Sequence, residues 1–275
     1  MAVISTNLAA NSAVRYLNMN SADQTASLSK LASGSRIVTA ADDASGLAIS
    51  TRISSDVTAL TQAATNASHG TSILQTADGG ASNISDMLQR MKALASQSAS
   101  GTVTDSERTY INAEFDQLVE EIDGLSQSTR YNGESLLDGT GAFAAGMVVV
   151  VGSDATADTI TVTINALDAT TLGVDTQDIS TQAGATTAIT AIDTAIDSVS
   201  SARANIGALQ SRFEFRSNTI ATSIENLEAA NSAIKDVDVA QESANLASIK
   251  VKTQASVAAA AQANSMPSEL LKLLQ

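Results

Sequence analysis

Hydrophobic side chains recur along most of the chain at spacings of three and four residues. This is the period of one helix face, because each helical residue turns by about 100°. A first segment of this kind ends at Ser33-Gly34-Ser35, and a second runs through residues 44–98 without a residue that forces a stop. At about 1.5 Å per residue, the second helix would be about 80 Å long. The pattern predicts helices far longer than the globular average of roughly 11–12 residues.

Further helical segments follow after residue 98. Thr104-Asp105-Ser106-Glu107 is a capping box, which predicts a helix start at this point. Between residues 192 and 234 one position of a seven-residue repeat is apolar without exception, and such a repeat predicts a coiled-coil-like bundle. A weaker, Ala-rich seam over residues 237–264 predicts a last helix, which we expect Pro267 to interrupt.

Only the middle of the chain has the period of strands. Residues 147–151 are apolar, residues 159–164 alternate between Thr and β-branched apolar residues, and Gly152-Ser153-Asp154 lies between them. This predicts a β-hairpin over residues 147–165. The fold class predicted is therefore mainly α: a long antiparallel coiled-coil-like helical bundle with a small β-hairpin region, in which the N- and C-terminal helices pair.

Charge is distributed unevenly along these elements. The whole chain has a net charge of −14, but residues 1–33 and 237–275 are nearly neutral, so the middle is strongly acidic. Two lightly charged, small-sided helices would bury too little apolar area as an isolated pair to offset an ordering cost of about 1–2 kcal/mol per residue. We therefore expect assembly of several copies, with the neutral ends inside and the acidic middle outside.

The composition argues against several classes of function. The chain has no Cys and one His, which disfavours disulfides, thiolate metal sites and a Ser-His-Asp triad. The acidic balance disfavours nucleic acid as a partner, and no window reaches the ~18 apolar residues of a membrane-spanning helix. The start of the chain also lacks the basic and apolar regions of a secretory signal peptide. We expect a structural protein and no enzyme, with no catalytic residue, cofactor or metal.

The apolar seam of the two terminal helices is where we expect assembly contacts. The predicted assembly residues are Val3, Ile4, Leu8, Val14, Leu17, Leu28, Leu31, Leu246, Ile249, Val257, Leu270 and Leu273. Arg203, with Gln210 and Ser217, occupies polar positions on the late heptad seam. Two interpretations stay open for Arg203: a polar contact between subunits, which we prefer, and local packing between helices.

Short motifs at both ends of the chain carry a further signal. The N-terminal part contains LASGSRI at residues 31–37, ADDASGLAI at 41–49 and SILQTADG at 72–79. The C-terminal part contains ALQSRF at residues 208–213 and AQANSMP at 261–267. In these motifs and their order, the chain resembles the flagellins, the subunits of the bacterial flagellar filament, in a short form without large outer domains.

The resemblance implies a domain organisation and a function. Residues 1–43 with 233–275 would form a terminal helical domain like D0 of the filament inner tube. Residues 44–232 would form a helical bundle with the β-hairpin, like domain D1, with a region of about 131–182 facing solvent. The function implied is a structural subunit that self-polymerises into the filament used for swimming motility, with terminal helices that fold on assembly.

The resemblance also implies partners and a location. They are further copies of the chain, the flagellar cap and hook-junction proteins, and a flagellin export chaperone. The location is the extracellular flagellum, reached through the type III export apparatus without a cleaved signal peptide. The alternatives are a hook–filament junction protein and a secreted coiled-coil protein, neither of which would form the bulk polymer.

A last implication concerns an animal innate-immune receptor and the filament lattice. The residues that match the receptor-binding pattern, and that could equally form a lattice patch, are Leu88, Gln89, Arg90, Leu94 and Glu114. Ala93 departs from this pattern, because receptor-activating members usually carry Glu there. We therefore expect no activation of the receptor.

Overall fold

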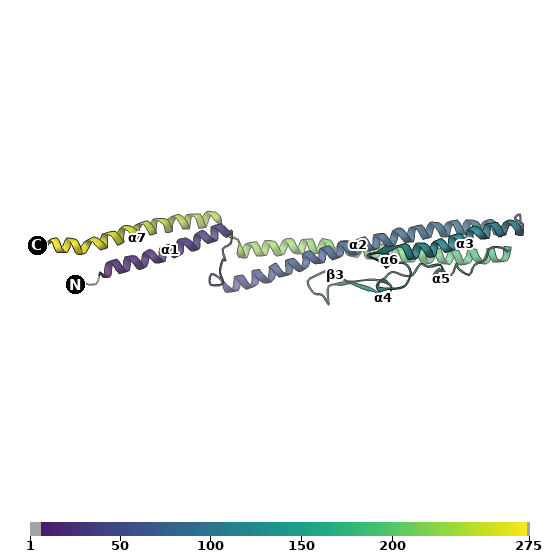
Figure 1. The fold of residues 1–275 in the computed structure, drawn as a ribbon, viewed down its shortest axis with the longest axis horizontal. Helices are drawn as coiled ribbons and strands as arrows, with labels where there is room; N and C mark the ends of the chain where they lie inside the picture. The colour runs from purple at the N-terminus through teal and green to yellow at the C-terminus, as the bar shows by residue number, and fades with distance from the viewer. Residues whose placement is uncertain (1–6, 274–275) are drawn as a thin grey trace. The chain divides into compact units, whose positions relative to one another are not determined.

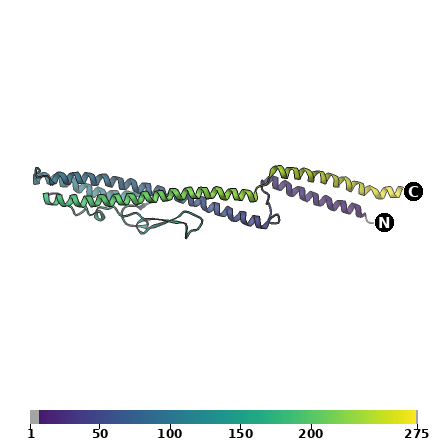
Figure 2. The same cartoon turned by 180° about the vertical axis from the view of Figure 1, so that it is seen from behind.

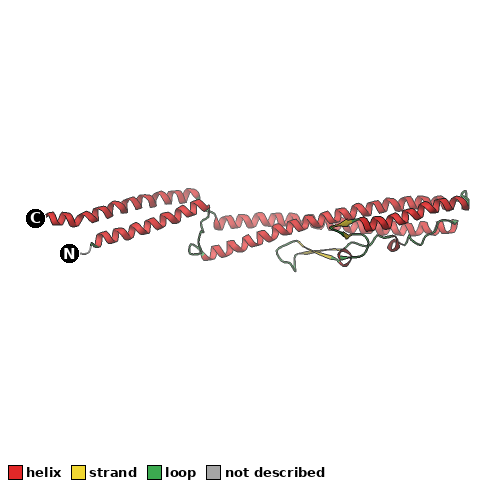
Figure 3. Ribbon diagram, in the orientation of Figure 1, coloured by secondary structure: helices red, strands yellow, loops and turns green. Residues whose placement is uncertain are grey.

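The computed structural model describes the backbone of residues 7–273 and the side chains of residues 7–266. Helices make up most of this part of the chain (Figure 3). In chain order the elements are α1 (Leu8–Ser33), α2 (Ala44–Ala99), α3 (Asp105–Ser128), β1 (Arg130–Tyr131), β2 (Glu134–Ser135), α4 (Ala142–Ala145), β3 (Met147–Val150), β4 (Thr159–Val162), α5 (Ala169–Leu172), α6 (Gln182–Lys235) and α7 (Val239–Leu273).

The long helices begin and end close to where the sequence predicts. Helix α1 ends at Ser33, and Gly34 follows in the left-handed conformation with φ 69°, which glycine adopts without steric cost. Helix α2 has 56 residues without a break. Helix α3 starts at Asp105, directly after Thr104, the N-cap of the predicted capping box. The predicted fold class, mainly α with a small antiparallel β region, is confirmed.

The chain divides into two compact units. One consists of residues 56–225, and the other of residues 1–55 with 226–275. Helices α2 and α6 each contribute to both units. The expected boundaries at residues 43 and 233 lie near the helix breaks, whereas the compact units include the first turns of α2 and the last turns of α6 with the terminal helices. The division into D0-like and D1-like domains stays a prediction.

Unit 56–225 is a bundle in which α2, α3 and α6 lie side by side (Figure 1). Its core follows the predicted seams, and its largest fully buried side chains include Leu74, Ile84, Leu88, Met91, Phe115, Ile122, Ile192, Ile206 and Phe213. Gly70 of α2 faces the ring of Phe213, where a Cβ atom would come within 2.7 Å of the ring. The small residue therefore gives the aromatic ring its place between α2 and α6.

Two short hairpins follow α3. Strands β1 and β2 are joined by Asn132-Gly133, both with positive φ (52° and 88°), as a two-residue hairpin turn requires. Strands β3 and β4 pair antiparallel from Met147↔Val162 to Val150↔Thr159, which confirms the predicted hairpin. The first hairpin was not predicted, because two residues per strand are too few to show a period of two.

Unit 1–55 with 226–275 contains the antiparallel pair of α1 and α7, which run beside each other in both views (Figures 1 and 2). The predicted pairing of the two terminal helices is thus present. The segments that lead into and out of the pair are hydrogen-bonded as well. The Arg36 N–H donates to the Lys235 carbonyl (2.6 Å), and the Val237 N–H donates to the Gly34 carbonyl (3.1 Å).

Pro267 does not interrupt the last helix, so this prediction is wrong. Helix α7 continues through Pro267 to Leu273. A proline inside a helix lacks the N–H that would bond the carbonyl four residues earlier, which here is that of Ala263. The Asn7 amide donates to this carbonyl at 2.6 Å. The side chain of the α1 N-cap residue thus replaces the lost helical hydrogen bond where α7 continues.

Candidate functional site

The predicted assembly residues lie on the paired helices α1 and α7, and several of them are exposed. The exposed fractions are 79% for Leu8, 47% for Val14, 46% for Leu28 and 52% for Val257. Large apolar side chains on a soluble surface mark contact sites when they lie together. These four leave a substantial apolar area of the helix pair in contact with solvent.

The other predicted assembly residues divide into three groups. Leu17 and Leu31 are half-buried, and Leu246 and Ile249 are buried against α1. Val3 and Ile4 lie outside the described residues, as do the side chains of Leu270 and Leu273. The pair thus buries part of its seam internally and exposes the rest.

Sequence reasoning missed further exposed apolar residues on the same two helices. They are Tyr16, Met19, Val251 and Met266, each at least half exposed. They fall off the three-and-four seam, so the periodicity gave no signal for them. Their presence means that apolar surface is available on more than one face of the helix pair.

The residues that match the receptor pattern split between core and surface. Leu88 and Leu94 are buried, with exposed fractions of 0% and 2%. Gln89 is exposed, and the Arg90 guanidinium pairs with the Glu114 carboxylate across α2 and α3 at 2.5 Å. The exposed part of the patch therefore consists of Gln89, Arg90 and Glu114.

Arg203 has a partner within the chain. Its Nε donates to Asp78 Oδ1 at 2.9 Å, which links α6 to α2. This hydrogen bond raises the pKa of the Arg203 guanidinium. About 40% of the Arg203 side chain stays exposed, so a contact with another subunit remains a prediction beside the local one.

A group of carboxylates lies where the segment before α6 meets α3. Burial raises the pKa of Asp116, and the nearby charges of Asp178 and Glu120 add to this shift. Asn112 donates to Asp116 at 3.0 Å and accepts from the Ile179 N–H at 2.9 Å. The hydrogen bonds of this group tie the segment to α3.

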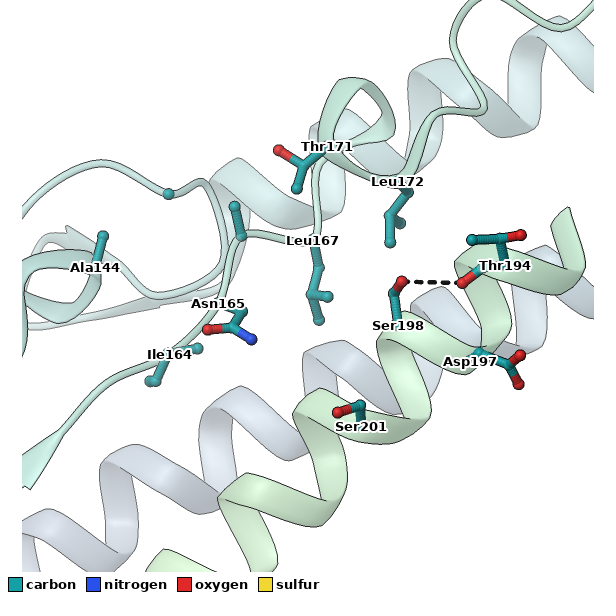
Figure 4. A pocket seen from close by; sticks show the side chains of 12 residues that line it. Ala144, Ile164, Asn165, Leu167, Thr171, Leu172, Thr194, Asp197, Ser198 and Ser201 are labelled. Carbon is teal, nitrogen blue, oxygen red and sulfur yellow. Dashed lines mark hydrogen bonds between the residues drawn. The ribbon is translucent and has the colours of Figure 1, made fainter. Parts of the chain in front are cut away.

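A cleft of about 660 Å³ separates the segment around α5 from α6 (Figure 4). Its floor is made by Ile164, Leu167 and Leu172, which are already buried in the chain. Its α6 wall presents hydroxyl groups and the exposed carboxylate of Asp197. Asp197 is the one titratable group of this lining, so the cleft does not provide the paired acid and base of proton-transfer chemistry.

No group of three His, Asp or Glu side chains among the described residues is placed to hold a metal ion. No helix in the described part of the chain has both the length and the apolarity needed to cross a bilayer.

Comparison with known proteins matches both halves of the chain to one family. The family model of the bacterial flagellin N-terminal helical region matches residues 4–142, and that of the C-terminal helical region matches residues 189–274. The flagellin of Halalkalibacterium halodurans is 36% identical over 275 residues, which cover 99% of this chain and 100% of the relative. The chain belongs to the bacterial flagellin family.

Similarity to two further proteins supports this family membership. A flagellar filament 30.7 kDa core protein of Treponema maltophilum is 37% identical over 285 residues, which cover 99% of both chains. The crystal structure of Bacillus cereus flagellin shares 31% identity with a TM-score of 0.51, and covers 61% of this chain and 94% of its own. This flagellin is therefore a structural subunit of the motility filament, and the junction-protein and coiled-coil alternatives are not favoured.

Proposed function

We propose that the α1–α7 pair is the element through which this flagellin polymerises, and that it gains its full order only in the filament. The observation that carries this proposal is the exposure of apolar side chains on both helices, among them Leu8, Val14, Val251 and Val257. Fully burying a side chain of this size contributes about 1.5–3 kcal/mol. Neighbouring copies that cover these side chains would supply what the isolated pair lacks.

The charge distribution supports the same arrangement. The strongly acidic middle needs water, whereas residues 8–33 carry only Arg15, Lys30 and Asp23. Weakly charged helices can be enclosed by other subunits at a small desolvation cost. The α1–α7 pair is thus the part of the subunit suited to the inside of a polymer.

Membership of the flagellin family supports a proposal for the further partners and the export route. We propose that the subunit adds beneath the flagellar cap, joins the hook through junction proteins, and is held by an export chaperone before assembly. It leaves through the flagellar type III apparatus without a cleaved signal peptide and becomes extracellular. The exposed apolar side chains of α7 support the chaperone, because a soluble subunit with such a surface needs a cover before it polymerises.

A matched pair of valines tests the assembly element. We expect Val14→Ser on α1 to reduce seeded polymerisation at least tenfold, since an apolar side chain that neighbours should cover is replaced by a polar one. Val148→Ser on β3 is the control, because Val148 is likewise exposed (59%) but lies outside the terminal helices. Sedimentation of filaments grown from seeds gives the polymerised fraction.

Hydrogen exchange on the same samples tests the order of the helices. Amides of α1 and α7 should exchange much faster in dilute subunits than in filaments, while those of α3 change little. Equal loss of polymer with Val14→Ser and Val148→Ser, or equal protection of α1 in both states, would refute the proposal.

A further inference from the structure

The side-chain amide of Asn7 contacts both terminal helices. Its Oδ1 accepts from the Ala10 N–H at 3.0 Å and so caps the start of α1. Its Nδ2 donates to the Ala263 carbonyl of α7 at 2.6 Å. An amide has one accepting end and one donating end, and here each end has a partner of the matching kind. One side chain therefore joins the N-cap of α1 to a defined position on α7.

That position on α7 is chemically distinct because of Pro267. A helical carbonyl normally accepts from the N–H four residues further on. For Ala263 this residue is Pro267, which has no N–H. In the body of α7, the Ala263 carbonyl is therefore the one left without a helical donor. Asn7 supplies the donor, and Ala263 itself is buried (7% exposed), where an unpaired carbonyl is costly.

Around Asn7 and Ala263, apolar packing gives the two helices little information about their register. Among the described residues of α1, only Ser27 is buried, and it is polar. On α7, Leu246 and Ile249 are buried against α1, but from there to Ala263 the helix is rich in alanine and serine. Such small side chains fit one another almost as well after a slide of seven residues, which is about 10 Å. In paired helices, a polar contact at one position is what distinguishes one register from another.

A second polar contact agrees with the first. The Ser27 hydroxyl donates to the Glu242 carboxylate near the other end of the pair. Asn7 and Ser27 are 20 residues apart on α1, and Ala263 and Glu242 are 21 residues apart on α7. Both contacts are thus satisfied in the same antiparallel register.

We propose that Asn7 is the residue that sets the register of α1 against α7, by recognising the carbonyl that Pro267 leaves free. A slide of α7 by seven residues would place the amide against a carbonyl that already has its helical donor. It would also leave the Ala263 carbonyl unpaired. This inference rests on the proposed function, because the register of α1 against α7 sets the shape of the element through which the subunit polymerises.

Disulfide trapping can read the register, since the chain has no cysteine of its own. Asn20→Cys with Ser256→Cys reports the observed register, in which these two side chains are hydrogen-bonded at 2.8 Å. Ala13→Cys with Lys252→Cys reports a slide of seven residues. In the observed register Ala13 lies midway between Asn7, which bonds Ala263, and Asn20, which bonds Ser256, and is therefore level with Ala259. The ratio of the two cross-link yields in filaments is the measurement.

Asn7→Asp is the decisive substitution, because it keeps an oxygen to cap α1 and removes the donor to Ala263. We expect the ratio of observed to slipped cross-link to fall at least fivefold. Asn11→Asp is the matched control, since Asn11 is an exposed amide four residues further along α1. This control should leave the ratio within twofold of the parent.

Pro267→Ala tests the coupling between the two residues. It returns an N–H to the Ala263 carbonyl, so the effect of Asn7→Asp should shrink at least threefold in this background. Each chain that carries a cysteine pair is added in trace amount to an excess of unsubstituted chains and grown into filaments. Weak polymerisation of a variant then does not prevent the measurement. The register assignment is overturned if Asn7→Asp leaves the cross-link ratio unchanged. It is also overturned if Asn11→Asp lowers the ratio as much as Asn7→Asp does, or if Asn7→Asp lowers it equally in the Pro267→Ala background.

Exclusion of a chain from these mixed filaments is also informative. If Asn7→Asp alone is excluded and Pro267→Ala restores its entry, the coupling stands. If the Asn7→Asp chain is excluded both alone and in combination with Pro267→Ala, the register assignment fails. Failure of the unsubstituted chain to polymerise from seeds would instead count against the proposed function.

Discussion

Gly79 and Gly80 are neighbours in α2 with opposite surroundings. A Cβ atom on Gly79 would meet no other atom within 4 Å. A Cβ atom on Gly80 would come within 2.7 Å of Thr129 Oγ1 and 2.8 Å of Leu137 Cδ1. The Thr129 hydroxyl is held by the Leu125 carbonyl at 2.8 Å, and Leu137 is fully buried, so neither can move aside easily. Gly80 is required by packing, whereas Gly79 is not.

We expect alanine substitutions at these two positions to have opposite signs. Gly79→Ala should stabilise the fold by about 0.5–1 kcal/mol, because alanine loses less backbone entropy in a helix. Gly80→Ala should destabilise it by about 1–2 kcal/mol, because overpacking outweighs that gain. Urea unfolding followed by circular dichroism gives both values. Equal changes for the two substitutions would show that the predicted clash is absent.

At the scale of elements, α3 shows how a helix start is defined by side chains. Thr104 Oγ1 accepts from the Glu107 N–H at 3.4 Å, and the Glu107 carboxylate accepts from the Thr104 N–H at 2.8 Å. The hydrogen bond from the Thr104 backbone, with a second from its hydroxyl, lowers the pKa of Glu107. The box was predicted from the sequence because it depends on four consecutive residues and on no distant contact.

Thr104→Ala should cost about 1 kcal/mol of unfolding free energy, the usual effect of losing an N-cap side chain. Thr109→Ala is the control, because the Thr109 hydroxyl only bonds the Asp105 carbonyl within the helix. The folded-state pKa of Glu107 is lowered, so its stabilising contribution is present above the unfolded pKa and is lost as pH falls through the folded value. The cost of Thr104→Ala, measured by urea unfolding, should therefore be smaller in acid than at pH 7. A cost that grows in acid would contradict this account.

At the scale of the whole molecule, net charge opposes assembly. Each subunit carries −14, mostly in the middle of the chain. Between Arg130 and Arg203 the sequence has no basic residue. Copies brought together in a polymer therefore repel one another through their acidic segments, and this repulsion is long-ranged at low ionic strength.

Salt should accelerate polymerisation by screening this repulsion. The Debye length falls from about 30 Å at 0.01 M to about 10 Å at 0.1 M ionic strength. We expect seeded elongation, followed by light scattering, to become several-fold faster over this range. Sodium and potassium chloride should act alike, since ionic strength is what matters. An elongation rate that falls steadily with added salt would argue against repulsion as the opposing force.

The long helices, the β3–β4 hairpin and the uneven charge could all be predicted from the amino-acid sequence. Each of these depends on local periodicity or on simple counting, and the family motifs agree with them. The sequence did not reveal the β1–β2 hairpin, whose strands are too short for a period, or the exposed apolar residues that lie off the seam. The folded arrangement was needed to tell which seam residues are buried and which are exposed, because burial depends on what packs opposite each face. It also decided that α7 continues past Pro267, because the donor that replaces the missing N–H comes from Asn7, 256 residues away from Ala263 in the chain.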